Sequence, residues 1–413
     1  MTRRTGILVL LCSLSAITFL DRLAIAVTEP GIRSDLRLGP DKWGWILSTY
    51  VLANALFEIP SGARGDRRGQ RSELTRIVAW WSSFTVATGW CRNFLQMVAA
   101  RFLFGLGTAG AYPNASGVLA KWFPEQEHAR AQGFIWAAGR MGAALAPLLF
   151  VPLERVWGWR AVFWLMGTIG VVWAAVWWTC LRPEPEDMIG IEQHEAGGTT
   201  TRSSRTAAGS EIPWRELIAL PQLWLIMAAY FCYAWGSWFF FGWFTTWMIR
   251  GEGFSIEQMG IFASFPFVMA MFGNLIGGGL SRRLVFKMGA VNAYRCVTAT
   301  CLVFGAALLL AMSIVRGHMA IVALATASFG VMDLMLPAAW AMCMGLGGRW
   351  GGTATAMMNT AGNLGGWICA LVFGYVVKAT SSYSLPLQAV AAMVLVAALL
   401  FSRVNSAHGL SGT

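Results

Sequence analysis

Long apolar stretches alternate with short polar joints along almost the whole chain. The stretches and the residues that interrupt them predict helices over residues 6–28, 43–63, 73–90, 93–119, 127–152, 159–181, 219–249, 256–281, 291–313, 318–345, 350–377 and 384–403. A helix of about 20 apolar residues spans the roughly 30 Å hydrocarbon core of a bilayer. The pattern therefore predicts an all-α polytopic membrane protein with twelve transmembrane helices. Gly and Pro in the fourth and fifth of these helices predict bends there.

One long polar segment interrupts the apolar pattern. Residues 182–218 contain a Pro-Glu-Pro-Glu run and a stretch rich in Gly, Thr and Ser, which predicts a flexible linker. It separates two six-helix bundles, residues 1–181 and 219–413. The sequence AGRMG at 138–142 resembles AGNLG at 361–365, six predicted helices later. Related halves of this kind are typical of secondary transporters.

Composition and charge narrow the class of protein. Of the 413 residues, 56% are hydrophobic and 12% are charged, whereas soluble chains carry about 25% charged residues. A cytosolic enzyme is therefore excluded. The net charge of +11 comes from short basic clusters between apolar stretches, and no continuous basic stripe suggests a nucleic-acid partner.

The basic clusters also predict topology. With the N-terminus in the cytoplasm, 19 Lys and Arg residues lie on that side and 9 on the other. The bias places both termini and the linker in the cytoplasm. We expect the protein itself to lie in the inner (plasma) membrane. The eight Cys form no CxxC pair and the four His show no ligand spacing, so we expect no metal site and no cofactor. We expect a monomer in the lipid bilayer.

Three arginines fall inside apolar stretches: Arg22, Arg101 and Arg140. Each charge costs about 2.5–3.5 kcal/mol at the centre of a membrane helix, so something must compensate it. Asp21 and Glu58 are possible local partners, and purely structural pairing is one interpretation. Because three guanidinium groups outnumber two acids in the first half, we favour an anion site. A guanidinium fork matches a carboxylate, which favours an organic acid over a halide.

Other polar residues in the apolar stretches are candidates for transport roles. Glu58 precedes Ile59 and Pro60, and either structural pairing or a transport role fits it. Asp333 lies in the middle of the tenth predicted helix without an obvious charged partner, which suits a proton carrier. Asn359 and Asn363 are one turn apart and share a helical face, where they can bond substrate hydroxyls or another helix.

Aromatic residues crowd the seventh predicted helix. Most are explained as lipid-facing or interfacial anchors. One face could line a cavity, and Tyr233 and Trp243 are the candidates there.

The loop after the second helix carries a recognisable motif. Residues 62–71, GARGDRRGQR, resemble the signature G-x-x-x-D-[RK]-x-G-x-[RK] of the major facilitator superfamily. In that family the glycine permits close helix contact, and the acidic and basic residues form a cytoplasmic latch against the other half. The resemblance therefore implies a latch made of Gly62, Asp66, Arg67, Gly69 and Arg71.

Within that superfamily the chain resembles the anion:cation symporters, which include bacterial sugar-acid permeases, sialin and the vesicular glutamate transporters. The resemblance rests on FLDR at 19–22, on RFLFGLG at 101–107 with YPN at 112–114 and WFP at 122–124, on PAAW at 337–340, and on NTAGNLGG at 359–366. It implies that Arg22 and Arg101 serve substrate binding and charge coupling, that Asp21 takes part in protonation, and that Asn359 faces substrate.

Two positions depart from the family pattern. Thr108 stands seven residues after Arg101, where the family usually has the Glu that carries the coupling proton, and Phe19 replaces the usual Tyr. Thr108 cannot ionise. Asp21, Glu58 or Asp333 must therefore replace that acid, or transport is uncoupled.

We therefore predict a secondary transporter that imports a small organic anion, such as a hexonate, hexuronate or aldarate, by proton symport through alternating access. Arg22 and Arg101 bind its carboxylate and Arg140 adds positive field. Asn359, Asn363 and Trp340 contact the hydroxylated part.

The alternatives are an exporter of drugs or metabolites with the same fold and an uncoupled anion uniporter or exchanger. The buried arginines count against an exporter of amphipathic drugs. A membrane enzyme would need a nucleophile or metal pattern that the sequence lacks, and the linker is too short for the signalling domain of a receptor.

Overall fold

The computed structural model describes residues 3–38, 40–180, 212–244, 247–255, 258, 261–380 and 382–406. These residues form helices and no strands. The helices are α1 (Arg3–Val27), α2 (Glu29–Leu36), α3 (Pro40–Arg68), α4 (Gln70–Trp90), α5 (Phe94–Thr108), α6 (Ala111–Trp122), α7 (Glu125–Cys180), α8 (Trp214–Ala219), α9 (Pro221–Trp238), the π-helices η3 (Phe239–Trp243) and η4 (Trp247–Gly251), α12 (Phe265–Met288), α13 (Ala290–Met312), α14 (His318–Leu334), α15 (Leu336–Gly347), the 3₁₀ turn η5 (Gly348–Trp350), α16 (Gly351–Thr380) and α17 (Ser384–Phe401).

These elements combine into the twelve predicted passes. The helices α5 and α6 together make the fourth pass, α7 makes the fifth and sixth, α9 with η3 and η4 makes the seventh, and α14 with α15 makes the tenth. Seven described segments are by themselves long and apolar enough to cross a membrane. The remaining passes pack along them, for example α4 and α12 along α7. The predicted all-α membrane architecture is therefore confirmed.

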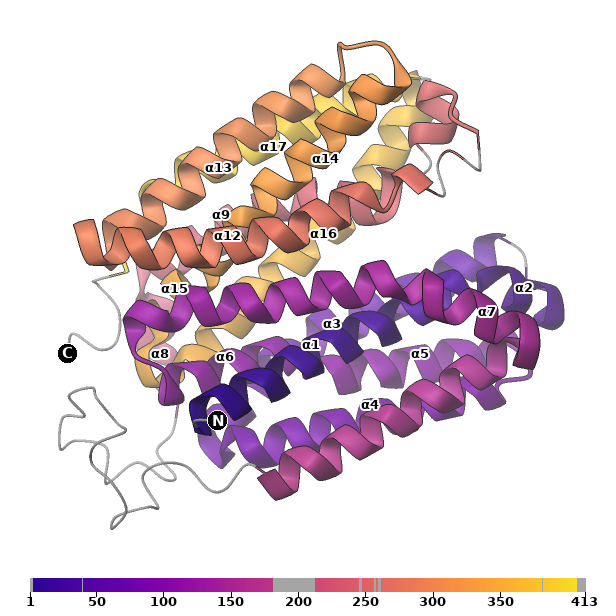
Figure 1. The fold of residues 1–413 in the computed structure, drawn as a ribbon, viewed down its shortest axis with the longest axis horizontal. Coiled ribbons are helices and arrows are strands. Elements are labelled where there is room, and N and C mark those ends of the chain that lie inside the picture. The colour runs from indigo at the N-terminus through magenta and orange to yellow at the C-terminus, as the bar shows by residue number, and fades with distance from the viewer. Residues whose placement is uncertain are drawn as a thin grey trace.

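The passes form two bundles that lie side by side (Figure 1). One contains α1 to α7 and the other α9 to α17. Arg4 and Glu127 line a common groove, the Tyr294 hydroxyl donates to the Glu125 carbonyl, and Arg295 donates to the Val404 carbonyl. These contacts gather the start and the described end of the chain at one end of the molecule, which we call the terminal end. The opposite end, which carries α2, is the distal end.

Breaks in the helices agree only in part with the predicted bends. The fourth pass breaks between α5 and α6, as its glycines predict. At Gly158 the backbone takes φ 77°, a conformation that glycine adopts without a steric cost, and there the chain turns from the fifth pass into the sixth. The tenth pass is also interrupted, at Met335 before Pro337, because proline cannot donate to the preceding helical turn. The apolar pattern did not predict that break.

Two short helices lie where none was expected. The helix α8 begins at Trp214 inside the predicted linker, most of which lies outside the described residues. The helix α2 lies at the distal end, where Asp35 accepts hydrogen bonds from Arg160 and from the Trp159 indole of α7. The Arg160 guanidinium holds the pKa of the Asp35 carboxyl below its ordinary value. This ion pair anchors α2 to the first bundle.

Glycines bring the two bundles together at α7 and α12. A Cβ added to Gly278 of α12 would lie 2.8 Å from the Ala129 carbonyl oxygen and 3.2 Å from the Gly133 Cα of α7. A Cβ added to the neighbouring Gly279 would meet nothing within 4 Å. Small residues of this kind let helix backbones approach closely inside a membrane.

The pair Gly278 and Gly279 provides a test of this packing. We expect Gly278→Ala to lower the free energy of unfolding by about 1–3 kcal/mol, because the added methyl group would collide with the backbone of α7. Gly279→Ala serves as the matched control, and it should be neutral or stabilise by up to about 1 kcal/mol through its better helix propensity. Melting temperatures in detergent measure the difference. Equal melting temperatures for the two variants would contradict the close approach.

Candidate functional site

A cavity of about 320 Å³ lies between the two bundles. The first bundle contributes Phe19, Arg22, Leu23, Ile25, Ala26, Tyr50, Val51, Asn54, Glu58, Arg101, Thr108, Tyr112, Trp136 and Arg140, and the second contributes Tyr230, Tyr233, Ser237, Trp238, Phe241, Gly242, Leu336, Asn359 and Asn363. Aromatic rings and a few polar groups therefore line it. A concave site with this composition is typical of small-molecule binding.

Arg22 and Arg101 enter the cavity from α1 and α5. Both guanidinium carbons lie 5.5 Å from the centre of the Tyr50 ring, and that of Arg101 lies 4.2 Å from the Phe104 ring. In the described part of the chain neither guanidinium donates a hydrogen bond or forms an ion pair, although Arg101 is only 2% exposed. Stacking on aromatic rings stabilises such a charge only partly. Their hydrogen-bonding capacity is thus open to a ligand with negative charge.

Asp21 precedes Arg22 on α1 but does not line the cavity. It is 1% exposed, neither of its carboxylate oxygens has a hydrogen-bond partner among the described residues, and it interacts electrostatically with Arg101. Asp21 is therefore buried beside Arg101 and outside the cavity, whereas Glu58 lines it.

Arg140 is neutralised, contrary to the expectation that it adds positive field. Its Nε donates to Asp333 Oδ2 at 2.7 Å and its Nη2 to Asp333 Oδ1 at 3.3 Å. Asp333 also accepts from the Tyr233 hydroxyl at 2.9 Å and the Asn274 amide at 3.0 Å. The prediction that Asp333 lacks a charged partner was wrong, because that partner is on the other half of the sequence. This fully buried ion pair joins the two bundles.

Glu58 joins the bundles at a second point. Its side chain, on α3, is 2% exposed, and its carboxylate oxygens accept from the amides of Asn359 and, at 3.0 Å, Asn363 on α16. Both asparagines also line the cavity. Of the alternatives left open for them, bonding between helices is realised here.

Three aromatic candidates differ in position. Tyr233 lines the cavity and is held by Asp333. Trp340 lies behind the lining, where its indole donates to the Tyr230 hydroxyl at 3.1 Å. Trp243 is also outside the cavity and stacks on Phe373 at 4.8 Å. Neither tryptophan is among the residues that line the cavity.

Sequence reasoning missed several lining residues. Tyr50 and Asn54 precede Glu58 by two turns and one turn of α3, so the spacing of polar residues in the second apolar stretch could have indicated them. Asn54 donates to the Thr108 hydroxyl at 3.1 Å. Tyr112 and Trp136 stack at 4.5 Å, a pairing of two helices that no local pattern reveals.

Only some residues of the predicted latch contact the second bundle. Asp66 accepts from the backbone N–H and the hydroxyl of Thr353, both at 2.7 Å, at the start of α16. A Cβ on Gly62 would reach within 2.8 Å of Ala356. Arg71 instead donates to the Trp178 carbonyl within its own bundle, and Gly69 turns the chain at φ 89°. Arg67 lines a groove near Trp214.

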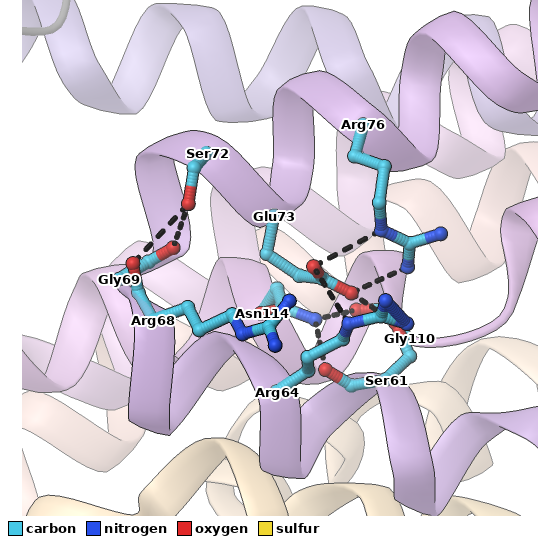
Figure 2. Close-up of polar contacts among 9 residues, drawn as sticks. All are labelled: Ser61, Arg64, Arg68, Gly69, Ser72, Glu73, Arg76, Gly110 and Asn114. Atoms are coloured by element: carbon cyan, nitrogen blue, oxygen red, sulfur yellow. Dashed lines mark hydrogen bonds and ion pairs between the residues drawn. The ribbon is translucent and has the colours of Figure 1, made fainter. Parts of the chain in front are cut away.

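The polar cluster beside this latch stabilises the first bundle at the terminal end (Figure 2). Glu73 accepts from the Ser61 hydroxyl at 3.2 Å and from two nitrogens of Arg76. The Asn114 amide donates to the Gly110 carbonyl at 2.8 Å and the Ser61 carbonyl at 3.3 Å. These bonds tie α3, α4 and α6 together, so that Asp66 is held against α16.

Comparisons with known proteins cover nearly the full chain. Residues 11–370 match the model of the Major Facilitator Superfamily. A probable sulfoacetate transporter, SauU of Cupriavidus necator, is 28% identical over 97% of this chain and 94% of its own. A probable L-galactonate transporter of Escherichia coli is 26% identical over 93% of this chain and 85% of its own. The solved structure of the transporter FucP in the outward conformation aligns with a TM-score of 0.74 and 15% identity over 98% of this chain and 100% of its own, which shows the same fold.

The ion pair between Arg140 and Asp333 can be tested with a double-mutant cycle. We expect Arg140→Gln and Asp333→Asn each to destabilise the protein by about 3–5 kcal/mol, because each leaves one buried charge without its partner. The double variant should lose much less than the sum of the two. Melting temperatures of the four purified proteins measure the cycle, and additive losses would contradict a direct bond between the two bundles.

Proposed function

Because this chain belongs to the Major Facilitator Superfamily, we propose that it imports a small organic anion, a sugar acid such as a hexonate, hexuronate or aldarate, by alternating access. The chain is a multi-pass membrane transporter and not an enzyme. The bias of its basic residues supports an inner-membrane location with both termini in the cytoplasm.

One observation carries this proposal: Arg22 and Arg101 direct two guanidinium groups without hydrogen-bond partners among the described residues toward one cavity. Guanidinium groups bind a carboxylate in a bidentate geometry. The names of the relatives are consistent with this, since sulfoacetate and L-galactonate are both organic anions. Three asparagines and four tyrosines on the same lining offer partners for hydroxyl groups of a sugar acid.

The cavity argues against the exporter alternative. Its volume of about 320 Å³ is at the lower end of the range for ligand sites, about 300–1,000 Å³. A large amphipathic drug would also have to cover two unpaired cations. A small anion fits the site better on both counts.

The contacts between bundles support an outward-facing state. Asp66 with Thr353, Gly62 with α16, and Glu58 with the two asparagines all connect the bundles on the terminal side of Arg22 and Arg101. With that end in the cytoplasm, the cavity is closed toward the cytoplasm. Import then requires these contacts to break as the bundles rock about the site.

The first prediction of this proposed function concerns Arg101. We expect Arg101→Ala to abolish uptake in proteoliposomes, because the substrate carboxylate loses a cation that stacks on aromatic rings and has no hydrogen-bond partner among the described residues. The exposed Arg92→Ala is the matched control and should transport normally. A thermal-shift screen of purified wild-type protein against hexonates, hexuronates, aldarates and sulfoacetate selects the substrate. Unchanged uptake in Arg101→Ala would contradict the proposed site.

The second prediction concerns coupling to protons. We propose symport, with Asp21, Glu58 and Asp333 as the candidate proton carriers, since Thr108 cannot ionise. An inward pH gradient should stimulate uptake, and uptake should make the external medium more alkaline. Uptake that ignores the gradient and moves no protons would instead indicate a uniporter or an exchanger.

A further inference from the structure

The charges that line the cavity or lie buried beside it balance one another. In the described chain this group consists of three acids and three bases: Asp21, Glu58, Asp333, Arg22, Arg101 and Arg140. With every carboxylate ionised the group is neutral. A monoanion that binds to Arg22 and Arg101 then leaves one uncompensated negative charge in a site of low dielectric, which is strongly unfavourable. Binding is favourable when one carboxylate takes up a proton at the same time.

The contacts of the three acids distinguish them. A proton on Asp333 would remove the partner of Arg140 and disturb a carboxylate held by two further donors. Asp21 lies off the cavity lining behind Arg101. Glu58 lines the cavity, and in the described structure its hydrogen-bond partners are two neutral amides, with no ion pair.

We propose that Glu58 carries the coupling proton, so that one proton enters with each substrate molecule. This inference rests on the proposed anion import and names the residue that couples it. Glu58 on α3 thereby takes the role that an acid at position 108 of α5 would otherwise have. A chain of hydrogen bonds connects Glu58 with Thr108: Asn363 donates to Glu58 and to Asn54, and Asn54 donates to Thr108.

Protonation of Glu58 also changes the contact between bundles. The ionised carboxylate accepts two amide hydrogen bonds from α16. When one oxygen becomes a hydroxyl, it is a weaker acceptor, so one of the amide hydrogen bonds weakens and that amide can bond a substrate hydroxyl instead. The same proton that balances the anion thus weakens a contact that holds the terminal end closed.

Other ionisable groups interact with Glu58 or lie on the elements packed against α3. Arg22 of α1 and Tyr230 of α9 interact with it electrostatically. The helices and turn packed against α3 carry further ionisable groups, namely Arg71, Glu73 and Arg76 of α4, Arg101 of α5, Tyr112 and Lys121 of α6, and Arg349 of η5, while α16 meets Glu58 with the two neutral asparagines. Glu73 is already paired with Arg76. Within this set Glu58 is the cavity-lining carboxylate without an ion pair.

The inference predicts a charge balance that depends on the substrate. A monoanion such as D-galactonate should move with one proton as a neutral pair, so a membrane potential set with K⁺ and valinomycin should not alter its accumulation. If one proton also moves with each dianion, such as galactarate, the transported pair has one net negative charge. Its uptake should rise when the interior is made positive.

The decisive experiment compares Glu58→Gln with wild type in proteoliposomes. Wild type should accumulate D-galactonate about ten-fold per unit of inward pH gradient, as one proton per anion requires. Glu58→Gln, which resembles the protonated form, should equilibrate D-galactonate by counterflow without accumulating it. Glu58→Asp should retain accumulation, and the half-exposed Glu29→Gln on α2 is the control carboxylate outside the cavity.

The outcomes separate the two hypotheses. No uptake by wild type of D-galactonate or of any other hexonate, hexuronate or aldarate in the panel would overturn the proposed function, and this inference with it. Gradient-driven accumulation in Glu58→Gln equal to wild type would overturn only the inference. Loss of accumulation in Asp21→Asn with its retention in Glu58→Gln would assign the proton to Asp21 and overturn the inference as well.

Discussion

The cost of an unpaired charge in an apolar environment governs the interior of this protein. Arg140 and Asp333 are each almost or fully buried, and neither would be tolerated alone. Their ion pair crosses from one bundle to the other, so the requirement for neutrality also determines how the halves meet. Arg22 and Arg101 line the cavity without a hydrogen bond or an ion pair among the described residues, so the site is open to an anion.

The fold supplies the close contacts that this arrangement needs. Glycines on α7 and α12 let the bundles approach to backbone contact. Breaks between α5 and α6 and between α14 and α15 occur beside lining or ion-paired residues, namely Thr108, Leu336 and Asp333. Interrupted helices are a recurrent way to place polar groups inside membrane transporters. Rigid elements thus hold a small polar site, while the contacts near Asp66 and Glu58 join the bundles on one side of it.

Much of this could be predicted from local patterns. The twelve passes follow from the spacing of apolar residues, and Arg22 and Arg101 could be singled out because a charge in such a stretch requires an explanation. The partner of Arg140 could not be predicted, since it is 193 residues away and on another helix. For the same reason, local patterns did not reveal that Trp340 donates to the Tyr230 hydroxyl or that Trp243 stacks on Phe373, and neither tryptophan lines the cavity.

The sequence by itself determined the membrane class, the number of passes and the residues whose charges need compensation, because hydropathy and charge are properties of each residue and its neighbours in the chain. Only the tertiary structure decided which charges compensate one another. It paired Arg140 with Asp333, placed Glu58 against Asn359 and Asn363, and left Arg22 and Arg101 facing the cavity. Pairing depends on distances between helices that meet only when the two bundles pack, and no local pattern encodes those distances.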